Sequence, residues 1–415
     1  MQPVKLTIEG VYWDSQIYSG EMLLFDADGA VHRIDWRGVV DSIADKNSSV
    51  QTAIRVAFSD SDLFYNQKVR KILCDPQIEG PIKAQLFQLA GLSLQAARRD
   101  WDENWKIEDT PFDFLPTDTD VYYNHIFAAG NSGLFSAPRS GVGAGRPFGK
   151  KTQKHHDAKI LQVKASDHFT AVAAAAGDDG LFEFAFKRSE SNVLDNERRL
   201  AGRPCSSCDW AFQSVMGWTV QNAFLASFRQ EKDPSSKRFA RVFDRIVDTQ
   251  EIFQDSLFEQ EESKGFVWGC REKMYRITSS GLEVTNYAHM PAKKSKAKAG
   301  GGHDTAQFAQ HGRVSLDFDP ASVIATGTAP FGTVLEFDDR LVVIRSDGQF
   351  EVMMGEPVHW RVFPRSEHYS NQLHIIYDDR IEIVSFVHDY FVDQTSKLAG
   401  FRRGSNDFVV EETGF

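Results

Sequence analysis

The sequence predicts a mainly β repeat protein built from small antiparallel sheets, and three observations carry this prediction. One phrase, an apolar run followed by small polar residues, a glycine and a second run, occurs five times in the 415 residues. A second phrase recurs 40 residues apart near the C-terminus. Phenylalanine is frequent, with 32 residues beside 8 Trp and 10 Tyr. Aromatic side chains suit half-buried strands and packed sheets.

The first phrase has the composition of a β-hairpin corner. It is clearest in H-I-F-A-A-G-N-S-G-L-F (125–135) and V-A-A-A-A-G-D-D-G-L-F (172–182). Glycine adopts positive φ without steric penalty and therefore suits the turn between two strands. The five corner glycines are Gly29, Gly133, Gly180, Gly281 and Gly348. Recurrence indicates a structural turn, because a ligand loop is normally present once.

The second phrase gives the order of strands within one repeat. E-F-D-D-R-L-V-V-I (336–344) matches I-Y-D-D-R-I-E-I-V (376–384), and the first copy runs into the Gly348 corner. One repeat therefore contains strand, turn, strand, turn and strand. A unit of about 40 to 50 residues with several strands has the size of a β-propeller blade. We expect units near 4–40, 112–140, 158–190, 208–245, 250–290, 314–360 and 361–396.

These units predict a single six- or seven-bladed β-propeller over residues 1–400, followed by a C-terminal tail at 401–415. An N-terminal strand is expected to pair into the last blade, because an open propeller would leave a sheet edge exposed.

Residues 48–105 break the β pattern and predict a helical insertion after the first blade. Apolar residues at helical spacing include Val50, Ile54 and Leu86. Asp62 is a candidate cap for a second helix, and Pro81 is a candidate first helical residue. The alternative is that this region belongs to a different α+β fold.

Two basic segments, 140–159 and 291–311, are expected to be flexible loops because they are rich in glycine and lysine. A-G-R-P-F-G-K-K-T (144–152) is not a phosphate loop, because Ala144 replaces its first glycine and Lys151 replaces its hydroxyl. The basic side chains could instead contact an acidic protein or a nucleic-acid backbone. The candidate binding residues are Arg139, Arg146, Lys150, Lys151, Lys154, His155 and His156.

Other candidate sites are weaker than their structural interpretations. Cys205 and Cys208 form a C-S-S-C pair, but a zinc site needs a second pair of ligands at matching spacing. We expect half-buried thiols there, with no metal and no cofactor. Asp26-Ala27-Asp28-Gly29 resembles the start of a calcium loop but lacks its third ligand and closing glutamate. A hairpin turn explains it better.

Bulk properties restrict the function classes. The net charge of -11 argues against a general nucleic-acid binder, since phosphate contacts need a basic surface. No stretch has the length and apolarity of a signal core or a membrane span. Four cysteines in 415 residues do not form a disulfide framework. The expected compartment is the cytoplasm.

The strand–turn–Gly–strand phrases and their period resemble β-propellers of the broad WD-repeat-like kind, over most of the chain apart from 48–105. The Gly-His and Trp-Asp signatures of that group do not recur. The resemblance implies a rigid body whose faces and loops bind other proteins. The first hypothesis is therefore a non-enzymatic scaffold or subunit of a larger cytosolic complex. The alternatives are a propeller enzyme of hydrolase or lyase type with a funnel active site, and a nucleic-acid-associated subunit that uses the basic loops.

Overall fold

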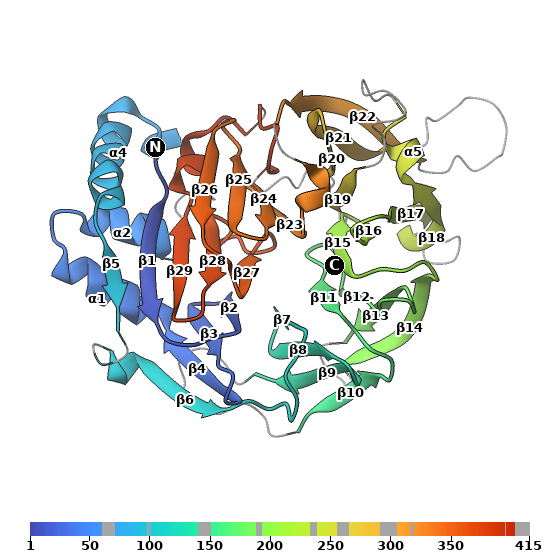
Figure 1. The fold of residues 1–415 in the computed structure, drawn as a ribbon, viewed down its shortest axis with the longest axis horizontal. Coiled ribbons are helices and arrows are strands. Elements are labelled where there is room, and N and C mark those ends of the chain that lie inside the picture. The colour runs from blue at the N-terminus through green and yellow to red at the C-terminus, as the bar shows by residue number, and fades with distance from the viewer. Residues whose placement is uncertain are drawn as a thin grey trace. The chain divides into compact units, whose positions relative to one another are not determined.

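The computed structural model describes residues 1–59, 71–97, 99, 101–139, 151–187, 193–232, 239–254, 265–290, 305–316, 319–394 and 396–402. Within these ranges the chain forms seven sheets of four or five strands (Figure 1). The fold is a mainly β, seven-bladed β-propeller, which confirms the predicted class and selects seven from the two predicted blade numbers. The described residues fall into two compact units, one from Met1–Thr110 and Gly327–Phe415 and one from Pro111–Gly141 and Arg146–Thr326.

The first unit contains three of the sheets. The first sheet has the order β2-β3-β4-β6, with β2 Asp14–Tyr18, β3 Glu21–Phe25, β4 Ala30–Asp35 and β6 Trp105–Asp109. The second has the order β23-β24-β25-β26, with β23 Ala325–Ala329, β24 Gly332–Phe337, β25 Arg340–Arg345 and β26 Phe350–Met354. The third has the order β27-β28-β29-β1-β5, with β27 His359–Val362, β28 Gln372–Ile376, β29 Arg380–Ser385, β1 Val4–Glu9 and β5 Leu94–Ala96.

The third sheet joins the two ends of the chain. β1 pairs antiparallel with β29, from Val4 opposite Ser385 to Glu9 opposite Arg380. The expected pairing of an N-terminal strand into the last blade is therefore present. β5 adds a short fifth strand parallel to β1, with Leu6 opposite Leu94.

The sheet β2-β3-β4-β6 is the first blade. The helical insertion lies within this blade, between β4 and β6, rather than after its last strand. Its described residues form α1 Trp36–Lys46, α2 Gln51–Phe58 and α4 Pro76–Ala90. Asp75 caps α4 by accepting a hydrogen bond from Gln77 N. The predicted start at Pro81 is wrong by five residues, because Pro76 and the Asp75 cap already begin the helix and Pro81 lies inside it. Asp62, the other predicted helix signal, lies outside the described residues.

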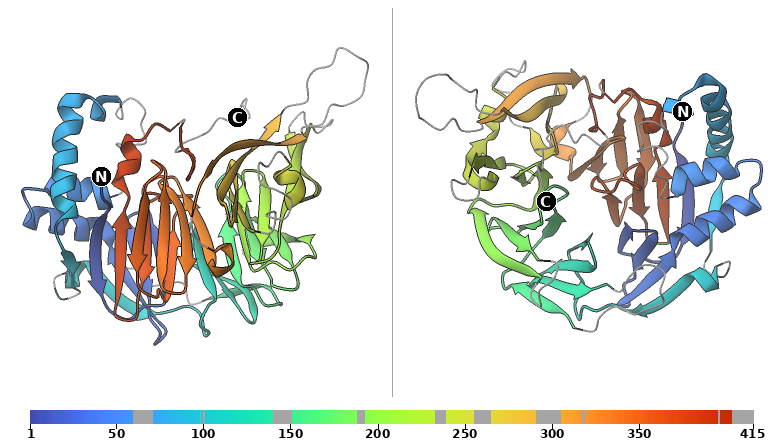
Figure 2. Two further views of the ribbon diagram at one scale, coloured as in Figure 1. Left: turned by 45° about the horizontal axis from the view of Figure 1, so that its top comes forward. Right: turned by 180° about the vertical axis from the view of Figure 1, so that it is seen from behind.

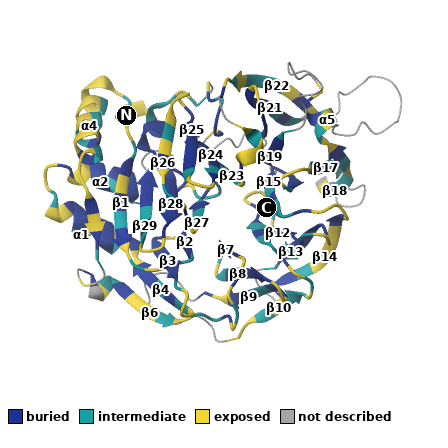
Figure 3. Ribbon diagram, viewed as in Figure 1, coloured by how far each residue is buried: buried dark blue, intermediate teal, exposed yellow. Residues whose placement is uncertain are grey.

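The insertion is fixed to the last blade by polar contacts at the end of α2. The carbonyl oxygen of Ala57 accepts hydrogen bonds from Ser385 Oγ at 2.6 Å and Asn371 Nδ2 at 3.2 Å. The carbonyl oxygen of Phe58 accepts from Gln372 Nε2 of the last blade at 3.2 Å and from Trp36 Nε1 of α1 at 2.7 Å. These contacts satisfy carbonyls that the helix itself leaves free at its C-terminus. Figure 2 shows the three helices beside β1, and Figure 3 shows exposed residues on the outer sides of α1 and α4.

The second unit contains the other four sheets, in the orders β10-β9-β8-β7, β11-β12-β13-β14, β15-β16-β17-β18 and β19-β20-β21-β22. The first comprises β7 Asp118–Tyr122, β8 His125–Gly130, β9 Gly133–Pro138 and β10 Gln153–His156. The second comprises β11 Gln162–Ala165, β12 Ala171–Ala175, β13 Leu181–Phe186 and β14 Leu194–Ala201. The third comprises β15 Ser207–Ala211, β16 Ser214–Trp218, β17 Ala223–Lys232 and β18 Phe239–Asp248, followed by helix α5 Thr249–Ile252. The fourth comprises β19 Phe266–Cys270, β20 Lys273–Thr278, β21 Gly281–Met290 and β22 Thr305–Val314.

The five corner glycines are turns, as predicted. All five have positive φ, from +80° at Gly348 to +137° at Gly281. At the first corner, Asp26 Oδ1 accepts hydrogen bonds from the backbone N–H of Asp28 at 3.0 Å and Ala30 at 2.8 Å. The carboxylate therefore stabilises the turn, and its calcium-loop resemblance has a structural origin.

Both segments expected to be basic loops contain strands. β10 lies within 140–159, and most of β22 lies within 291–311. Both strands are the outermost of their sheets, where one edge faces solvent and polar side chains are tolerated. Their polar composition therefore resembled that of a loop. The predicted C-terminal tail lies almost wholly outside the described residues.

Candidate functional site

The predicted basic residues are distributed along β10 and its flanks. Lys151 and Lys154 are exposed, and Lys154 Nζ lies 2.7 Å from Asp157 Oδ1. That ion pair lowers the pKa of the Asp157 carboxyl. Lys154 Nζ also lies 5.6 Å from the centre of the Phe135 ring, which is within cation–π range. Arg146 and Lys150 lie outside the described residues.

The other predicted residues contact side chains and backbone of this chain: His155 and Arg139 contact their own sheet, and His156 contacts β14 of the next sheet. His155 Nε2 lies 2.7 Å from Ser136 Oγ. His156 Nδ1 lies 3.1 Å from Glu197 Oε2. Arg139 is buried, and its backbone N–H donates to Asn124 O at 2.6 Å. The structure places Arg139, Lys154, His155 and His156 in or beside one sheet, and the assignment of an anion-binding role to them stays a prediction.

The two cysteines of the C-S-S-C pair are buried. Burial raises the pKa of Cys205 to about 12 and that of Cys208 well above its ordinary value. A thiol held in its protonated form is a poor nucleophile and a poor metal ligand. The backbone of Cys205 instead exchanges two hydrogen bonds of 2.9 Å with Gly177, at the corner that precedes Gly180. Within the described ranges, no group of three or more His, Cys, Asp or Glu side chains is placed to hold a metal ion.

Polar side chains on the first strand of several blades form hydrogen bonds with the neighbouring sheet. The sequence analysis did not predict these contacts. In the second unit, Asp118 Oδ2 accepts from Val163 N at 2.9 Å, and Asp120 Oδ2 accepts from Ala165 N at 2.8 Å. The available signal was the alternation of acidic residues in D-T-D-V-Y (118–122), on an otherwise buried strand. β7 and β11 belong to different sheets and do not pair with each other, so the N–H groups of β11 that face β7 need other acceptors. The two carboxylates are these acceptors.

A similar set of side-chain hydrogen bonds between two sheets of the first unit resembles a catalytic group. Ser15 Oγ lies 3.1 Å from His374 Nδ1, and Arg361 donates to both carboxylate oxygens of Asp14 at 2.9 Å. Ser15, His374 and Asp14 are completely buried. Burial, with the nearby Arg361 charge, lowers the pKa of His374 to about 3. Asp14 and Ser15 lie on β2, whereas Arg361 and His374 lie on the last blade, so these buried contacts hold β2 against that blade. An imidazole with a lowered pKa is also a weak general base near neutral pH.

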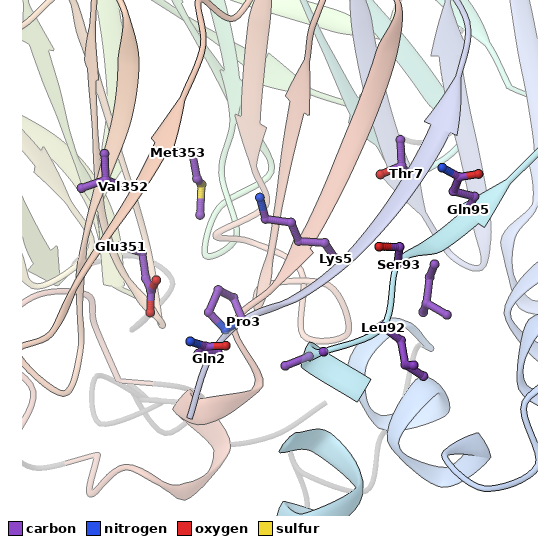
Figure 4. Close-up of a pocket in the computed structure, with 13 residues that line it drawn as sticks. Gln2, Pro3, Lys5, Thr7, Leu92, Ser93, Gln95, Glu351, Val352 and Met353 are labelled. Carbon is purple, nitrogen blue, oxygen red and sulfur yellow. The ribbon is translucent and has the colours of Figure 1, made fainter. Parts of the chain in front are cut away.

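A groove of about 470 Å³ lies in the first unit beside β26 (Figure 4). Glu351, Val352 and Met353 of β26 line one side of it. β1 contributes Lys5 and Thr7. The remaining lining residues are Gln2, Pro3, Ala90, Gly91, Leu92, Ser93, Leu94 and Gln95.

The charged side chains of this groove are balanced within the chain. Lys5 Nζ lies 3.3 Å from Glu382 Oε2, and Glu351 Oε1 lies 2.5 Å from Nη1 of the buried Arg345. The groove is therefore polar without a net local charge, and its uncharged hydrogen-bonding groups include Thr7, Ser93 and Gln95.

No helix within the described ranges is both long and apolar enough to cross a membrane.

Comparisons with known proteins return structural likeness at very low sequence identity. No protein-family model matches the chain, and no curated protein matches it. A structure described as the AfRom2 CNH domain is 8% identical, with a TM-score of 0.33 over 65% of this chain and 94% of that chain. The COPII outer coat vertex on membranes is 10% identical, with a TM-score of 0.36 over 66% of this chain and 70% of that chain. Chaetomium thermophilum Sqt1, bound to the N-terminus of ribosomal protein L10, is 10% identical, with a TM-score of 0.37 over 65% of this chain and 74% of that chain.

Proposed function

We propose that this chain is a non-enzymatic scaffold that binds other proteins as a subunit of a cytosolic complex. The observation that carries the proposal is an exposed apolar row on β26, beside the polar groove. The exposed fractions of Phe350, Val352 and Met354 are 44%, 54% and 66%. Contiguous exposed apolar side chains with a polar rim are typical of protein-binding surfaces.

The way the chain uses its polar groups also supports this proposal. Asp14, His374 and Cys205, which resembled chemical groups, are buried and hydrogen-bonded within the blades. Asp14, Asp120 and His374 hold sheets together. Burial of Cys205 suppresses its thiolate.

The test is affinity purification of the tagged full-length chain from the cells that express it, after nuclease treatment and followed by mass spectrometry. A protein partner recovered in stoichiometric amount supports the scaffold. Nuclease treatment removes proteins held only through nucleic acid. Recovery of no stable protein partner would contradict the proposal.

Two deletions test whether the basic segments contribute to binding. One removes 141–150 and the other removes 293–302. The first is limited to these residues because removal of 153–156 would delete strand β10 and disturb the sheet. Loss of the partner from either variant, with an unchanged melting temperature, would assign binding to that segment.

A further inference from the structure

The outer edge of β26 presents backbone hydrogen-bonding groups that have no partner among the described residues. Arg345 N–H donates to Gln349 O at 2.8 Å, and Gly355 N–H donates to Asp339 O at 2.9 Å. These two bonds flank the ladder in which Val342 stands opposite Val352. Hydrogen-bonded residues alternate in an antiparallel pair. The backbone groups of Glu351 and Met353 therefore form hydrogen bonds with β25. The N–H and C=O groups of Phe350, Val352 and Met354 point away from β25, towards the outer edge of the sheet.

β26 is the last strand of its sheet, and no described strand pairs with its outer edge. The two faces of the strand differ. Phe350, Val352 and Met354 form the exposed apolar row on one face. Glu351 and Met353 belong to the opposite face, and Met353 is buried among Leu341, Val343 and other residues of the same core cluster. Figure 4 shows Glu351 and Met353 on the β26 side of the groove.

We infer that β26 binds one extended peptide segment of a partner protein by strand addition. The segment pairs with the outward N–H and C=O groups of Phe350, Val352 and Met354. Its side chains alternate, with apolar residues against the exposed row and small uncharged polar residues directed into the groove. This inference rests on the proposed function and specifies where and how a partner is held.

The groove favours a single peptide over the edge of a second folded copy. Strand addition takes its affinity from main-chain hydrogen bonds and its specificity from pockets that receive alternate side chains. The groove volume of about 470 Å³ falls within the range of roughly 300 to 1,000 Å³ that is usual for ligand pockets. Charge complementarity also defines the occupant. Lys5 and Glu351 are already paired with Glu382 and Arg345, so the groove accepts uncharged polar side chains.

The experiment selects linear peptides from a phage-displayed random 12-residue library against the full-length chain. We expect enriched peptides with apolar residues at every second position. Their affinities are then measured for the wild-type chain and two variants. Val352→Pro removes one outward N–H, which an edge strand tolerates when that group faces solvent. Val352→Thr keeps the N–H and the β-branched shape.

Val352→Pro should weaken binding at least about tenfold, whereas Val352→Thr should change it by less than about threefold. Thermal melts of both variants establish that the fold is retained. If Val352→Pro lowers the melting temperature strongly, Met354→Lys replaces it and should also weaken the selected peptides. Hydrogen exchange followed by mass spectrometry on the wild-type chain should show added protection at 350–354 with peptide bound.

Three outcomes of these measurements on the purified chain would overturn the inference. They are selection of no peptide, selection of peptides unaffected by every β26 variant, and a wild-type dimer in light scattering that Val352→Pro converts to monomer. The last would show that β26 pairs with a second copy. The proposed function is tested separately by the affinity purification, where recovery of no stable partner would contradict it. A stable cellular partner that β26 variants still retain would support the scaffold and contradict this docking mode.

Discussion

β14 and β26 are both the last strand of a four-stranded sheet, yet their side chains differ sharply. β14 reads L-D-N-E-R-R-L-A, and its four exposed central residues, 196–199, include one Glu and two Arg. β26 reads F-E-V-M-M and exposes a phenylalanine, a valine and a methionine. Charged side chains protect sheet edges against pairing with another chain. β14 therefore has the composition of a protected edge, and β26 has that of an edge available to a partner.

The contacts of the two edges support this difference. On β14, Arg199 Nε donates to Asp179 O at 2.8 Å, and Arg198 Nη2 lies 3.3 Å from Glu183 Oε1. These bonds direct long charged side chains across the neighbouring strand and the preceding corner. On β26, Glu351 is the one charged residue, and its carboxylate forms an ion pair with Arg345 of the adjacent strand β25. One fold thus contains edges with opposite interaction properties.

The largest expected effect is a difference in stability between valine substitutions at two corner glycines, Gly180 near β14 and Gly348 near β26. A Cβ added at Gly180 would collide with the carbonyl oxygen of Ala201 at the end of β14, whereas one added at Gly348, before β26, would have nothing within 4 Å. Gly180→Val should lower the free energy of unfolding by roughly 3–5 kcal/mol, from positive-φ strain and overpacking together. Gly348→Val should lower it by about 1–3 kcal/mol from strain alone. Chemical denaturation of both variants checks this, and equal losses would contradict the role of Ala201.

Acid should weaken the unit that carries β26 through His374. Its pKa is about 3 when folded, against 6.5 ordinarily, so unfolding binds a proton at intermediate pH. The associated stability is complete above pH 6.5 and is lost as pH falls from 6.5 towards 3, up to about 5 kcal/mol. Denaturant titrations between pH 7 and pH 4 should show this loss. His374→Gln should be less stable at pH 7 and have a flatter pH profile, and an unchanged slope would exclude His374 as its source.

The smallest effects on stability should come from exchanging the character of the two edges. Glu197→Val with Arg199→Val makes β14 more apolar and should promote self-association. It should lower the free energy of unfolding by about 1 kcal/mol, because Arg199 loses its bond to Asp179 and Glu197 loses its contact with His156. Met354→Lys makes β26 more like β14 and should change stability by less than about 0.5 kcal/mol. Light scattering measures association, and thermal melts measure stability. If both variants remain monomeric and bind partners normally, edge charge does not control docking.

Most of the fold could be predicted because its signals are local. The corner glycines and the repeated D-D-R turn each lie within a few residues of the strands that they connect. The insertion was also recognisable, although its range and helix start were displaced. α1 begins at Trp36, before the predicted range, and Asp75 was overlooked as the cap of α4.

The candidate site was much harder to predict. The basic residues stood out in the sequence because of their charge, but His155 and His156 contact Ser136 and Glu197. F-E-V-M-M gave no functional signal, since an alternating apolar stretch equally describes a strand covered by its neighbours. Whether such a strand is covered depends on residues distant in the chain.

The sequence by itself determined the class of fold, the turns and the approximate length of the repeat, because hairpins depend on neighbouring residues. Only the tertiary structure decided which strands are edges, how β1 and β5 extend the last blade, and how Ser385 and Asn371 hold the end of α2. It also decided that β26 has an exposed apolar row and outward backbone groups beside a groove. These properties arise from contacts between residues hundreds of positions apart, and burial on one strand is set by what the rest of the chain places against it.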